Sequence, residues 1–422
     1  MLNDRYGNPL TTSSRAAADA YCDAMDRTLA GDAGCVAAYE TAIAADPDFA
    51  LAHIGLARHH QVWGNRDGIA APLAAAQAAT GLSPQERAHI NAFALLLTGK
   101  VGAGYAAIRA HLVDYPRDAL IAQTCTGVFS LIGFSGQPGR EAELLAFTSQ
   151  LAPAYGDDWW FTGQHAFSQM EAGQTGPAAA TIETSLNGNA RNANAAHIKS
   201  HLFYETGETT AGRDYLTDWM TGYARDGLLH CHLSWHSALW ALEQDDVDHM
   251  WAVIDADLQP EKTQSPSLNV MTDMASILYR AERRGVEIAP DRWHAVSAYA
   301  SQCFPKPGLA FADVHAALAH AMAGNSEALT LIIEGARGPA GDVVKVLAQA
   351  FGAIAAQDWA QAQSHLNIAL QDHARIGGSR AQRDLIEFAM SSVLLRQGHA
   401  QTARQLLSIR RPNCTHAGSV LQ

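Results

Sequence analysis

The sequence predicts an all-α protein in which paired helices stack into one continuous superhelix, an α-α solenoid. Alanine and leucine dominate the chain, and apolar residues recur at steps of three and four, as on one face of a helix. Runs in which Val, Ile or Thr alternate strictly with polar residues are few, so no sheet is predicted. The helices come in pairs around a recurring turn, which indicates a repeat.

The first clear pair of helices is predicted over residues 35–62. One helix ends before Pro47, which marks the turn, and the next helix carries the small residues Gly55 and Ala57. Together with Ala42, these residues would let the two helices approach closely, as in a tetratricopeptide unit. The fold is therefore expected to be tetratricopeptide-like. Similar units are predicted near residues 164–190, 346–373 and 387–410.

Turns and caps punctuate the predicted array. The segment 83–86, Ser-Pro-Gln-Glu, predicts a helix N-terminus with the serine as cap and the proline at the first position. Asp157 or Asp158 is expected to cap the helix that follows it. The chain has no long linker and no segment of low complexity that would separate two domains. Residues 1–422 are therefore expected to form one domain enclosing a polar interior site. Loops are predicted at 257–266, 305–308 and 335–341.

Length, charge and cysteine content narrow the classes of function. The 422 residues are 48% hydrophobic, which is enough for a large core. The net charge of −13 and the lack of a basic stripe argue against a nucleic-acid partner. No stretch approaches the roughly 18 uninterrupted apolar residues of a membrane span, and the N-terminus lacks the apolar core of a signal peptide. Six scattered cysteines without a CxxC pair predict reduced thiols in a cytoplasmic protein.

Two pairs of histidines form the most specific candidate site: His197 with His201, and His232 with His236. The i, i+4 spacing puts both imidazoles of a pair on one helix face, one turn apart. Two such helices packed side by side would point four imidazoles into one pocket. Imidazole binds transition metals and transfers protons near neutral pH, so the pairs predict a chemical site.

A divalent transition metal is one interpretation of these pairs. Four imidazoles, with Asp273 or Asp255 as a carboxylate ligand, would suit zinc, iron, manganese or copper. The chain has no HExxH signature, however, and its 19 histidines produce some i, i+4 pairs by chance. The alternative is that each histidine only makes a hydrogen bond across a helix interface.

A small-molecule pocket without a metal is the second interpretation. Histidine with a neighbouring carboxylate is the basic unit of acid/base catalysis, and ligand sites combine aromatic walls with a few polar groups. The alternative is a buried polar network that fixes the register of the repeats. The expected acid/base groups are His201, His232, His236, Asp273 and His315. The expected ligand-contacting residues are Trp159, His197, Cys231, Trp235, Tyr279, Ser379 and Arg383.

Two of these residues have a plainer structural alternative. Cys231 points about 100° away from His232 on a helix, so the two would not pair, and a buried cysteine usually behaves as a small hydrophobe. The segment 377–379, Gly-Gly-Ser, lacks the Gly-Lys-Ser/Thr of a phosphate loop, so a turn is predicted with Ser379 capping the next helix. Arg380 and Arg383 at that helix N-terminus would still favour an anionic group.

Seven separated segments match one family pattern. They are Pro9-Leu10-Thr11-Thr12, Ala45-Asp46-Pro47, His197-x-x-x-His201, Cys231-His232-x-x-Trp235-His236-x-Ala238-Leu239, Asp273-x-x-Ser276-x-Leu278-Tyr279-Arg280, Phe311-x-Asp313-x-His315 and Gly377-Gly378-Ser379-x-Ala381-Gln382-Arg383-Asp384. Through them the chain resembles the tetratricopeptide repeat protein 38 family. The resemblance implies an all-α repeat fold, and it implies no particular activity. Tyr204 stands where that family tends to carry a Glu, and Asn194 where it carries a Trp.

Two functions are predicted. The first is binding or acid/base conversion of a small-molecule ligand at the histidine-rich pocket, with metal assistance left open. Hydrolysis or isomerisation is expected rather than redox chemistry, because no nucleotide fingerprint is present. The alternative is a non-enzymatic scaffold that binds peptides in its concave groove. Burial of the histidine pairs would favour the pocket, and an open apolar groove would favour the scaffold. A homodimer is left open.

Overall fold

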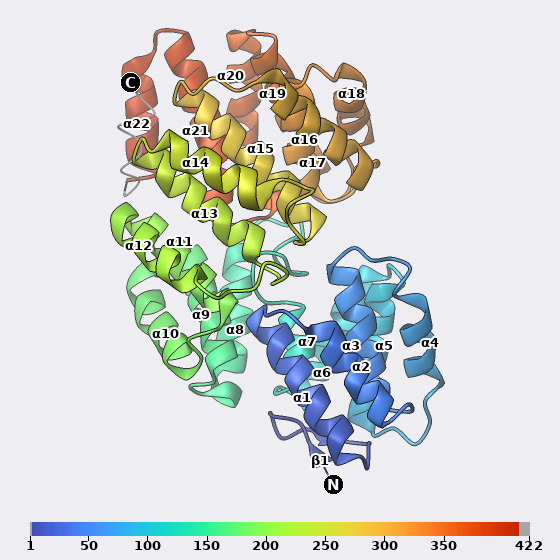
Figure 1. Cartoon of the computed structure of the whole chain (residues 1–422). Coiled ribbons are helices and arrows are strands. Elements are labelled where there is room, and N and C mark those ends of the chain that lie inside the picture. The colour runs from blue at the N-terminus through green and yellow to red at the C-terminus, as the bar shows by residue number, and fades with distance from the viewer. Residues whose placement is uncertain (1, 413–422) are drawn as a thin grey trace.

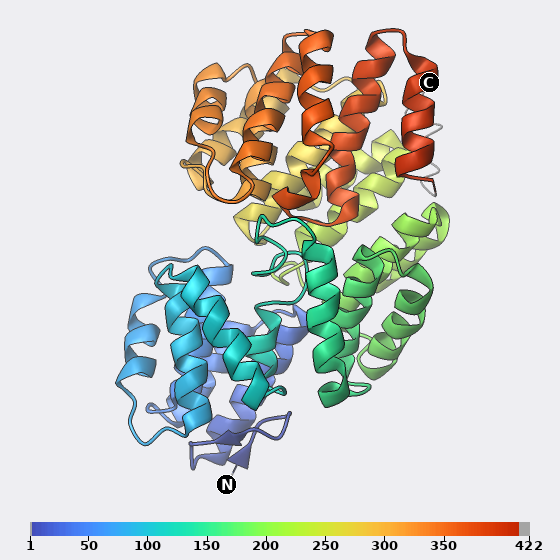
Figure 2. The same cartoon turned by 180° about the vertical axis from the view of Figure 1, so that it is seen from behind.

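A computed structural model describes residues 2–412 of the chain, and these residues fold into 22 α-helices, most of them joined by short turns and α7 joined to α8 by the longer loop 124–139 (Figure 1). The helices follow one another as antiparallel pairs, and each pair packs on the next. The prediction of an all-α, tetratricopeptide-like solenoid is therefore confirmed. The opposite view shows the same succession from the N-terminal to the C-terminal helices (Figure 2).

The first part of the chain forms a small hairpin and eight helices. Their bounds are β1 (Leu2–Asn3), β2 (Pro9–Leu10), α1 (Arg15–Ala30), α2 (Cys35–Ala45), α3 (Ala50–Val62), α4 (Ala70–Ala78), α5 (Pro84–Leu97), α6 (Val101–Asp114), α7 (Ala119–Gln123) and α8 (Arg140–Tyr155). The hairpin is a correction to the expectation of no sheet. Its antiparallel strands have two residues each, which is too short for an alternating sequence pattern to reveal them.

The remaining helices continue the array. Their bounds are α9 (Trp159–Glu171), α10 (Thr175–Gly188), α11 (Ala193–Thr206), α12 (Thr209–Met220), α13 (His230–Glu243), α14 (Val247–Val253), η1 (Ile254–Leu258), α15 (Ser267–Arg283), α16 (Pro290–Cys303), α17 (Ala310–Met322), α18 (Ser326–Gly335), α19 (Gly341–Ala355), α20 (Trp359–Ala369), η2 (His373–Ile376), α21 (Arg380–Arg396) and α22 (Ala400–Arg410). The predicted loop at 257–266 begins inside the π-helical turn η1, and the two later loops are confirmed.

The predicted helix pairs coincide with α2 and α3, α9 and α10, α19 and α20, and α21 and α22. Gly55 shows why the first pair needs a small residue. A Cβ atom at this position would lie 2.4 Å from the ring of Tyr39, so only glycine allows α3 to approach α2 this closely. Caps also fall where expected: Ser83 forms a capping box with Glu86, and Asp158 accepts backbone hydrogen bonds at the start of α9.

From α9 onward the odd-numbered helices form an inner row and the even-numbered helices an outer row. Helices α13, α15, α17 and α21 are buried on nearly all sides, whereas α10, α18 and α22 bury only a narrow stripe. An inner helix that carries polar residues must therefore pair them with other inner helices, because buried polar groups need partners.

The chain also curls back on itself around α11. Helix α1 packs against α11, and α21 packs against both α11 and α15. These helices are far apart in the sequence. Their contacts enclose the face of α11 that carries the first histidine pair.

Buried apolar side chains gather mainly in two large clusters, one drawn from residues 6–198 and one from residues 231–403. Helix α11 contributes Ala195 and Ile198 to the first cluster, and α13 contributes Cys231 and Trp235 to the second. The two histidine pairs therefore lie where the clusters meet. The single domain over residues 1–422 stays a prediction. None of the helices within residues 2–412 is both long and apolar enough to cross a membrane.

Candidate functional site: a buried four-histidine cluster beside a cavity

Helices α11 and α13 hold the candidate site, and each begins at a fixed point. Asn192 caps α11 by accepting a hydrogen bond from the backbone of Ala195. The loop before α13 is attached to the end of α1, because the backbone N–H of Leu228 and the hydroxyl of Tyr223 both donate to the carbonyl of Gly31. These contacts set the position of α13 relative to the N-terminal helices.

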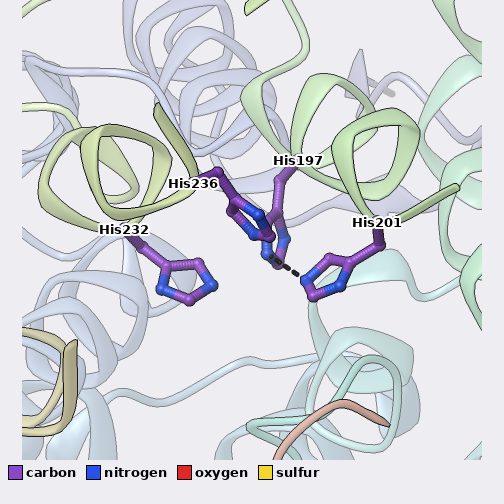
Figure 3. A group of neighbouring side chains, drawn as sticks. All are labelled: His197, His201, His232 and His236. Carbon is purple, nitrogen blue, oxygen red and sulfur yellow. Dashed lines mark hydrogen bonds between the residues drawn. The ribbon is translucent and has the colours of Figure 1, made fainter. Parts of the chain in front are cut away.

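The imidazoles of His197, His201, His232 and His236 form the four-histidine cluster (Figure 3). Each ring can offer one nitrogen such that all four nitrogens lie within 4.8 Å of one another. The prediction that the two pairs converge is confirmed. All four side chains are buried, with between 0% and 8% of each residue exposed. This group of side chains could hold a metal ion.

Only one hydrogen bond joins members of the cluster. The Nε2 atoms of His197 and His201 lie 2.7 Å apart, so one imidazole donates and the other accepts. The rings of His232 and His236 lie 5.1 Å apart between centroids and nearly perpendicular, without a hydrogen bond between them. The cluster therefore satisfies few of its own polar atoms.

Asp273 on α15 orients His232. Nδ1 of His232 lies 3.0 and 2.9 Å from the two carboxylate oxygens of Asp273, so this nitrogen carries the proton and donates it. The indole of Trp235 stacks on the same imidazole, with centroids 5.1 Å apart and an interplanar angle of 13°. The ring is thus fixed with Nδ1 on the carboxylate, which is the arrangement of a metal-binding histidine supported by a carboxylate.

His236 is the least satisfied member of the cluster. It is fully buried, and neither of its ring nitrogens has a hydrogen-bond partner within residues 2–412. Nδ1 of His201 also lacks a partner there. A buried polar group without a partner costs about 1–3 kcal/mol, so a purely structural network would not be expected to leave three nitrogens in this state.

Burial sets the protonation of the cluster. It lowers the pKa of His197, His201 and His236 well below 6.5, and the neighbouring imidazoles lower these pKa values further. These rings are therefore neutral at pH 7, which is the state that binds a metal. Burial raises the pKa of Asp273, while the nearby His232 opposes this effect.

A cavity of about 550 Å³ adjoins the cluster. His197 and His232 form part of its wall, together with residues of α1, α3, α7, α9 and α15. Its size is that of a site for a small organic ligand. Its aromatic lining residues are Tyr39, Trp63, Phe93, Phe129, Phe134 and Phe167.

The structure separates the two carboxylates that were considered as ligands. Asp273 contacts the cluster through His232, behind the ring rather than at Nε2. Asp255 lies on η1 and pairs with Arg292, with about half of its side chain exposed. Asp255 is therefore not near enough to serve the cluster, because the turn after α14 places it on the surface.

The three aromatic residues that were expected to line the site lie outside the cavity. Trp235 is fully buried behind His232 and does not line the cavity. Trp159 lies under the guanidinium of Arg5, at 4.6 Å from its ring centroid. Tyr279 packs in the core against Phe351. The aromatic walls come instead from other helices and from the loop between α7 and α8, whose contribution no local sequence pattern indicated.

Three further expected residues lie away from the cavity. His315 donates from Nδ1 to the carbonyl of Phe311, four residues earlier on α17. Cys231 is fully buried and its thiol pKa is raised well above its usual range by burial, which disfavours a nucleophilic thiolate. Ser379 caps α21 in a capping box. None of these residues lines the cavity.

The N-terminus of α21 does receive an anionic group, and this group is Glu171. Its carboxylate oxygens accept from the backbone N–H of Arg380 at 3.1 and 3.2 Å, and one lies 3.6 Å from Arg383. Arg140 donates to the carbonyls of Ala374 and Gly378 in the preceding turn. The glycine-rich turn therefore joins α8 and α9 to α21, as a structural contact within the chain.

A second buried group that could hold a metal was not predicted from the sequence. Nδ1 of His89 and Nε2 of His111 each lie 2.8 Å from the same oxygen of Asp118, which also caps α7. Burial would raise the pKa of Asp118, but the two imidazoles hold it below its usual range. The three residues are 22 and 7 positions apart, so no short motif could have indicated them.

The scaffold alternative predicted an open apolar groove. Large aliphatic side chains that are exposed within residues 2–412 are spread singly over several helices, and single exposed side chains are ordinary on protein surfaces. The scaffold alternative stays a prediction. These side chains are Val62, Val101, Val113, Leu331, Ile368 and Ile409.

No model of a known protein family matches the chain. It is similar to the crystal structure of yeast Tom70, at 12% identity over 95% of this chain and 87% of that one, with a TM-score of 0.37. For the P58(IPK) TPR domain, the identity is 14% over 90% of this chain and 99% of that one, with a TM-score of 0.21. For Naa15/Naa10 bound to HypK-THB, the identity is 12% over 94% of this chain and 63% of that one, with a TM-score of 0.23. The likeness to TPR-domain proteins is distant and concerns the fold alone, and membership of the tetratricopeptide repeat protein 38 family stays a prediction.

Proposed function

We propose that the four-histidine cluster binds a divalent transition metal ion and that the metal acts on a small molecule held in the adjoining cavity. The reaction would be hydrolysis or another acid/base conversion. The observation that carries the proposal is the convergence of four buried imidazoles in which His236 has no hydrogen-bond partner among the described residues.

The donor set favours particular metals. Four imidazole nitrogens suit zinc, copper, iron or nickel better than the hard cations magnesium and calcium, which prefer oxygen. Tetrahedral zinc with bonds of about 2.0–2.1 Å would need its nitrogens roughly 3.3 Å apart. His197 and His201, now 2.7 Å apart at Nε2, would separate slightly and exchange their hydrogen bond for bonds to the metal.

The surrounding residues would each have a chemical task. A metal held by three of the imidazoles, or by all four with a fifth position open, would act as a Lewis acid and lower the pKa of a water molecule at the open position. His197 and His232 face the cavity, so a ligand there approaches the cluster from their side. Asp273 accepts a hydrogen bond from Nδ1 of His232 and leaves Nε2 available. Its negative charge would stabilise the positive charge that develops on that ring.

Elemental analysis of the purified full-length protein tests the proposal. The wild type is compared with the His232→Ala/His236→Ala double variant after both have passed through a weak chelator. Circular dichroism checks that helical content is retained. A matched control is His294→Ala/His399→Ala, which removes two exposed histidines and leaves the cluster intact.

The expected result is about one equivalent of metal in the wild type and in the surface control, and none in the double variant. A wild type that binds no metal after incubation with zinc, iron, copper or nickel would overturn the proposal. Equal metal in the wild type and the double variant would also overturn it, and a matching loss in a His89→Ala/His111→Ala variant would place the metal at Asp118 instead.

A further inference from the structure

The cavity beside the cluster contains a cationic group without an ionic partner. Arg58 on α3 lines the cavity, and its side chain donates a hydrogen bond to the amide oxygen of Gln61 one turn later. Among the described residues it forms no ion pair. Arg27, the other arginine in the wall, is already paired with Asp23.

Arg58 is charged despite its surroundings. Burial lowers its pKa to about 10, which still leaves the guanidinium protonated at pH 7. Arg58 is half-buried, so its charge loses part of its hydration without gaining a counter-ion, which is costly. Asp32 also lines the cavity, but its carboxylate accepts from the backbone of Ala33 and does not pair with Arg58.

The rest of the wall near the histidines offers a second donor without an acceptor. Asn269 on α15 is only 5% exposed, lines the cavity, and its Nδ2 atom has no partner among the described residues. It lies one helical turn before Asp273, on the same face of α15, and therefore beside His232. Arg58 therefore presents hydrogen-bond donors to a cavity whose wall is largely apolar, and the Asn269 amide lies in that wall beside His232.

From this arrangement we infer that the cavity binds an organic acid: a carboxylate received by Arg58, carried on an apolar body that packs against the aromatic wall. A guanidinium matches a carboxylate with two parallel hydrogen bonds, which a neutral alcohol cannot replace. The aromatic side chains supply the apolar contact area.

This inference names the class of ligand on which the proposed function would act. It rests on the proposed function only where it assumes that the bound acid reacts at the four-histidine cluster. Binding of the acid depends on Arg58 and the cavity, whereas metal binding depends on the cluster. The two can therefore fail separately, and the experiment records both.

The test uses octanoate and 1-octanol, whose flexible chains adapt to the shape of the cavity and which differ at the charged end. Isothermal titration calorimetry measures both ligands with the wild type, Arg58→Met and Arg58→Lys. The matched control is Arg66→Met, which removes an exposed positive charge just after α3. Metal content is measured in every preparation.

Octanoate is expected to bind the wild type and the Arg66→Met control equally, and Arg58→Met roughly 10- to 100-fold more weakly, because a charged hydrogen bond is lost. Arg58→Lys should recover part of the loss. 1-Octanol should bind wild type and Arg58→Met alike, which shows that the cavity of the variant is intact. Metal content should not differ between them.

The inference is wrong if Arg58→Met binds octanoate as the wild type does, or if the wild type does not bind it at millimolar concentration. It is also wrong if His232→Ala/His236→Ala loses octanoate while Arg58→Met keeps it, because the carboxylate would then sit on the metal. Absence of metal with octanoate binding that still depends on Arg58 would refute the proposed function alone.

Discussion

The carboxylate of Asp273 on α15 forms a hydrogen bond with the imidazole of His232 on α13, and this contact joins the two helices at the site. Both carboxylate oxygens lie within 3.0 Å of Nδ1, and both side chains are almost fully buried. The contact fixes which nitrogen of His232 faces the other three histidines. A carboxylate in this position orients a metal ligand without binding the metal itself.

Replacing this carboxylate tests its positioning role. Asp273→Asn keeps the shape of the side chain and removes the charge, so the zinc dissociation constant should rise about 10- to 100-fold. Competition with a chromophoric chelator measures it. Asp255→Asn is the control, because Asp255 pairs with Arg292 on the surface. Unchanged affinity in Asp273→Asn, or an equal loss in both variants, would contradict the assignment.

Removing the metal should destabilise the protein in proportion to its affinity. A metal present at 1,000 times its dissociation constant adds about 4 kcal/mol to the free energy of unfolding. Differential scanning fluorimetry should therefore show a lower midpoint after chelation and recovery when the metal is returned. An unchanged midpoint in the wild type would argue that the cluster holds no ion.

His236→Leu should separate the structural cost of the cluster from its function. Leucine removes two buried nitrogens that have no partner among the described residues, so the metal-free variant should be about 1 kcal/mol more stable than the metal-free wild type. The same variant should no longer respond to added metal. A variant less stable than the metal-free wild type would mean that His236 contributes a favourable contact.

Replacing a helical glycine by alanine should have opposite effects on stability at Gly55, where α2 and α3 approach closely, and at Gly102, where there is open space. Gly55→Ala should destabilise the protein by about 1–3 kcal/mol, because its Cβ would lie 2.4 Å from the buried ring of Tyr39. Gly102→Ala on α6 meets nothing within 4 Å and should stabilise by about 0.5–1 kcal/mol through helix propensity. Urea unfolding measures both. Equal effects would show that the packing at Gly55 relaxes.

The fold was largely predictable because its signals are local. Helix periodicity, the turn at Pro47 and the cap at Ser83 act within a few residues, and each predicted its element. The convergence of the two histidine pairs was predictable for the same reason. Each pair is set by one helix, and the imidazole side chains of α11 and α13 meet between the two helices.

The remainder of the site depends on contacts that no local pattern encodes. Asp273 could be named but not distinguished from Asp255, because only the tertiary structure places α15 behind α13 and η1 at the surface. Arg58 contributes to the cavity from α3, far from the histidines in sequence, and no motif marks it. The group of Asp118 with His89 and His111 was missed for this reason too.

The last prediction concerns His320, a buried histidine far from the cluster in sequence. Its Nδ1 forms a 2.8 Å hydrogen bond with the hydroxyl of Ser297, whose oxygen accepts from the side-chain amide of Asn325. Burial lowers the pKa of His320 to about 4, against the usual 6.5. Between these values the unfolded chain binds a proton that the folded protein does not.

The free energy of unfolding should therefore decrease as the pH falls. The contribution of His320 is complete above pH 6.5, decreases by about 1 kcal/mol per pH unit between pH 6.5 and 4, and changes no further once the folded state is protonated. Urea unfolding at pH 7, 6 and 5 measures the slope.

His315 and His373, whose pKa values are lowered to about 4 and about 3, add to the slope of the wild type. His320→Gln cannot titrate, so its slope should be shallower by about 1 kcal/mol per pH unit, whatever its stability at pH 7. Parallel slopes for the two proteins would mean that His320 takes up its proton in the folded state at an ordinary pH.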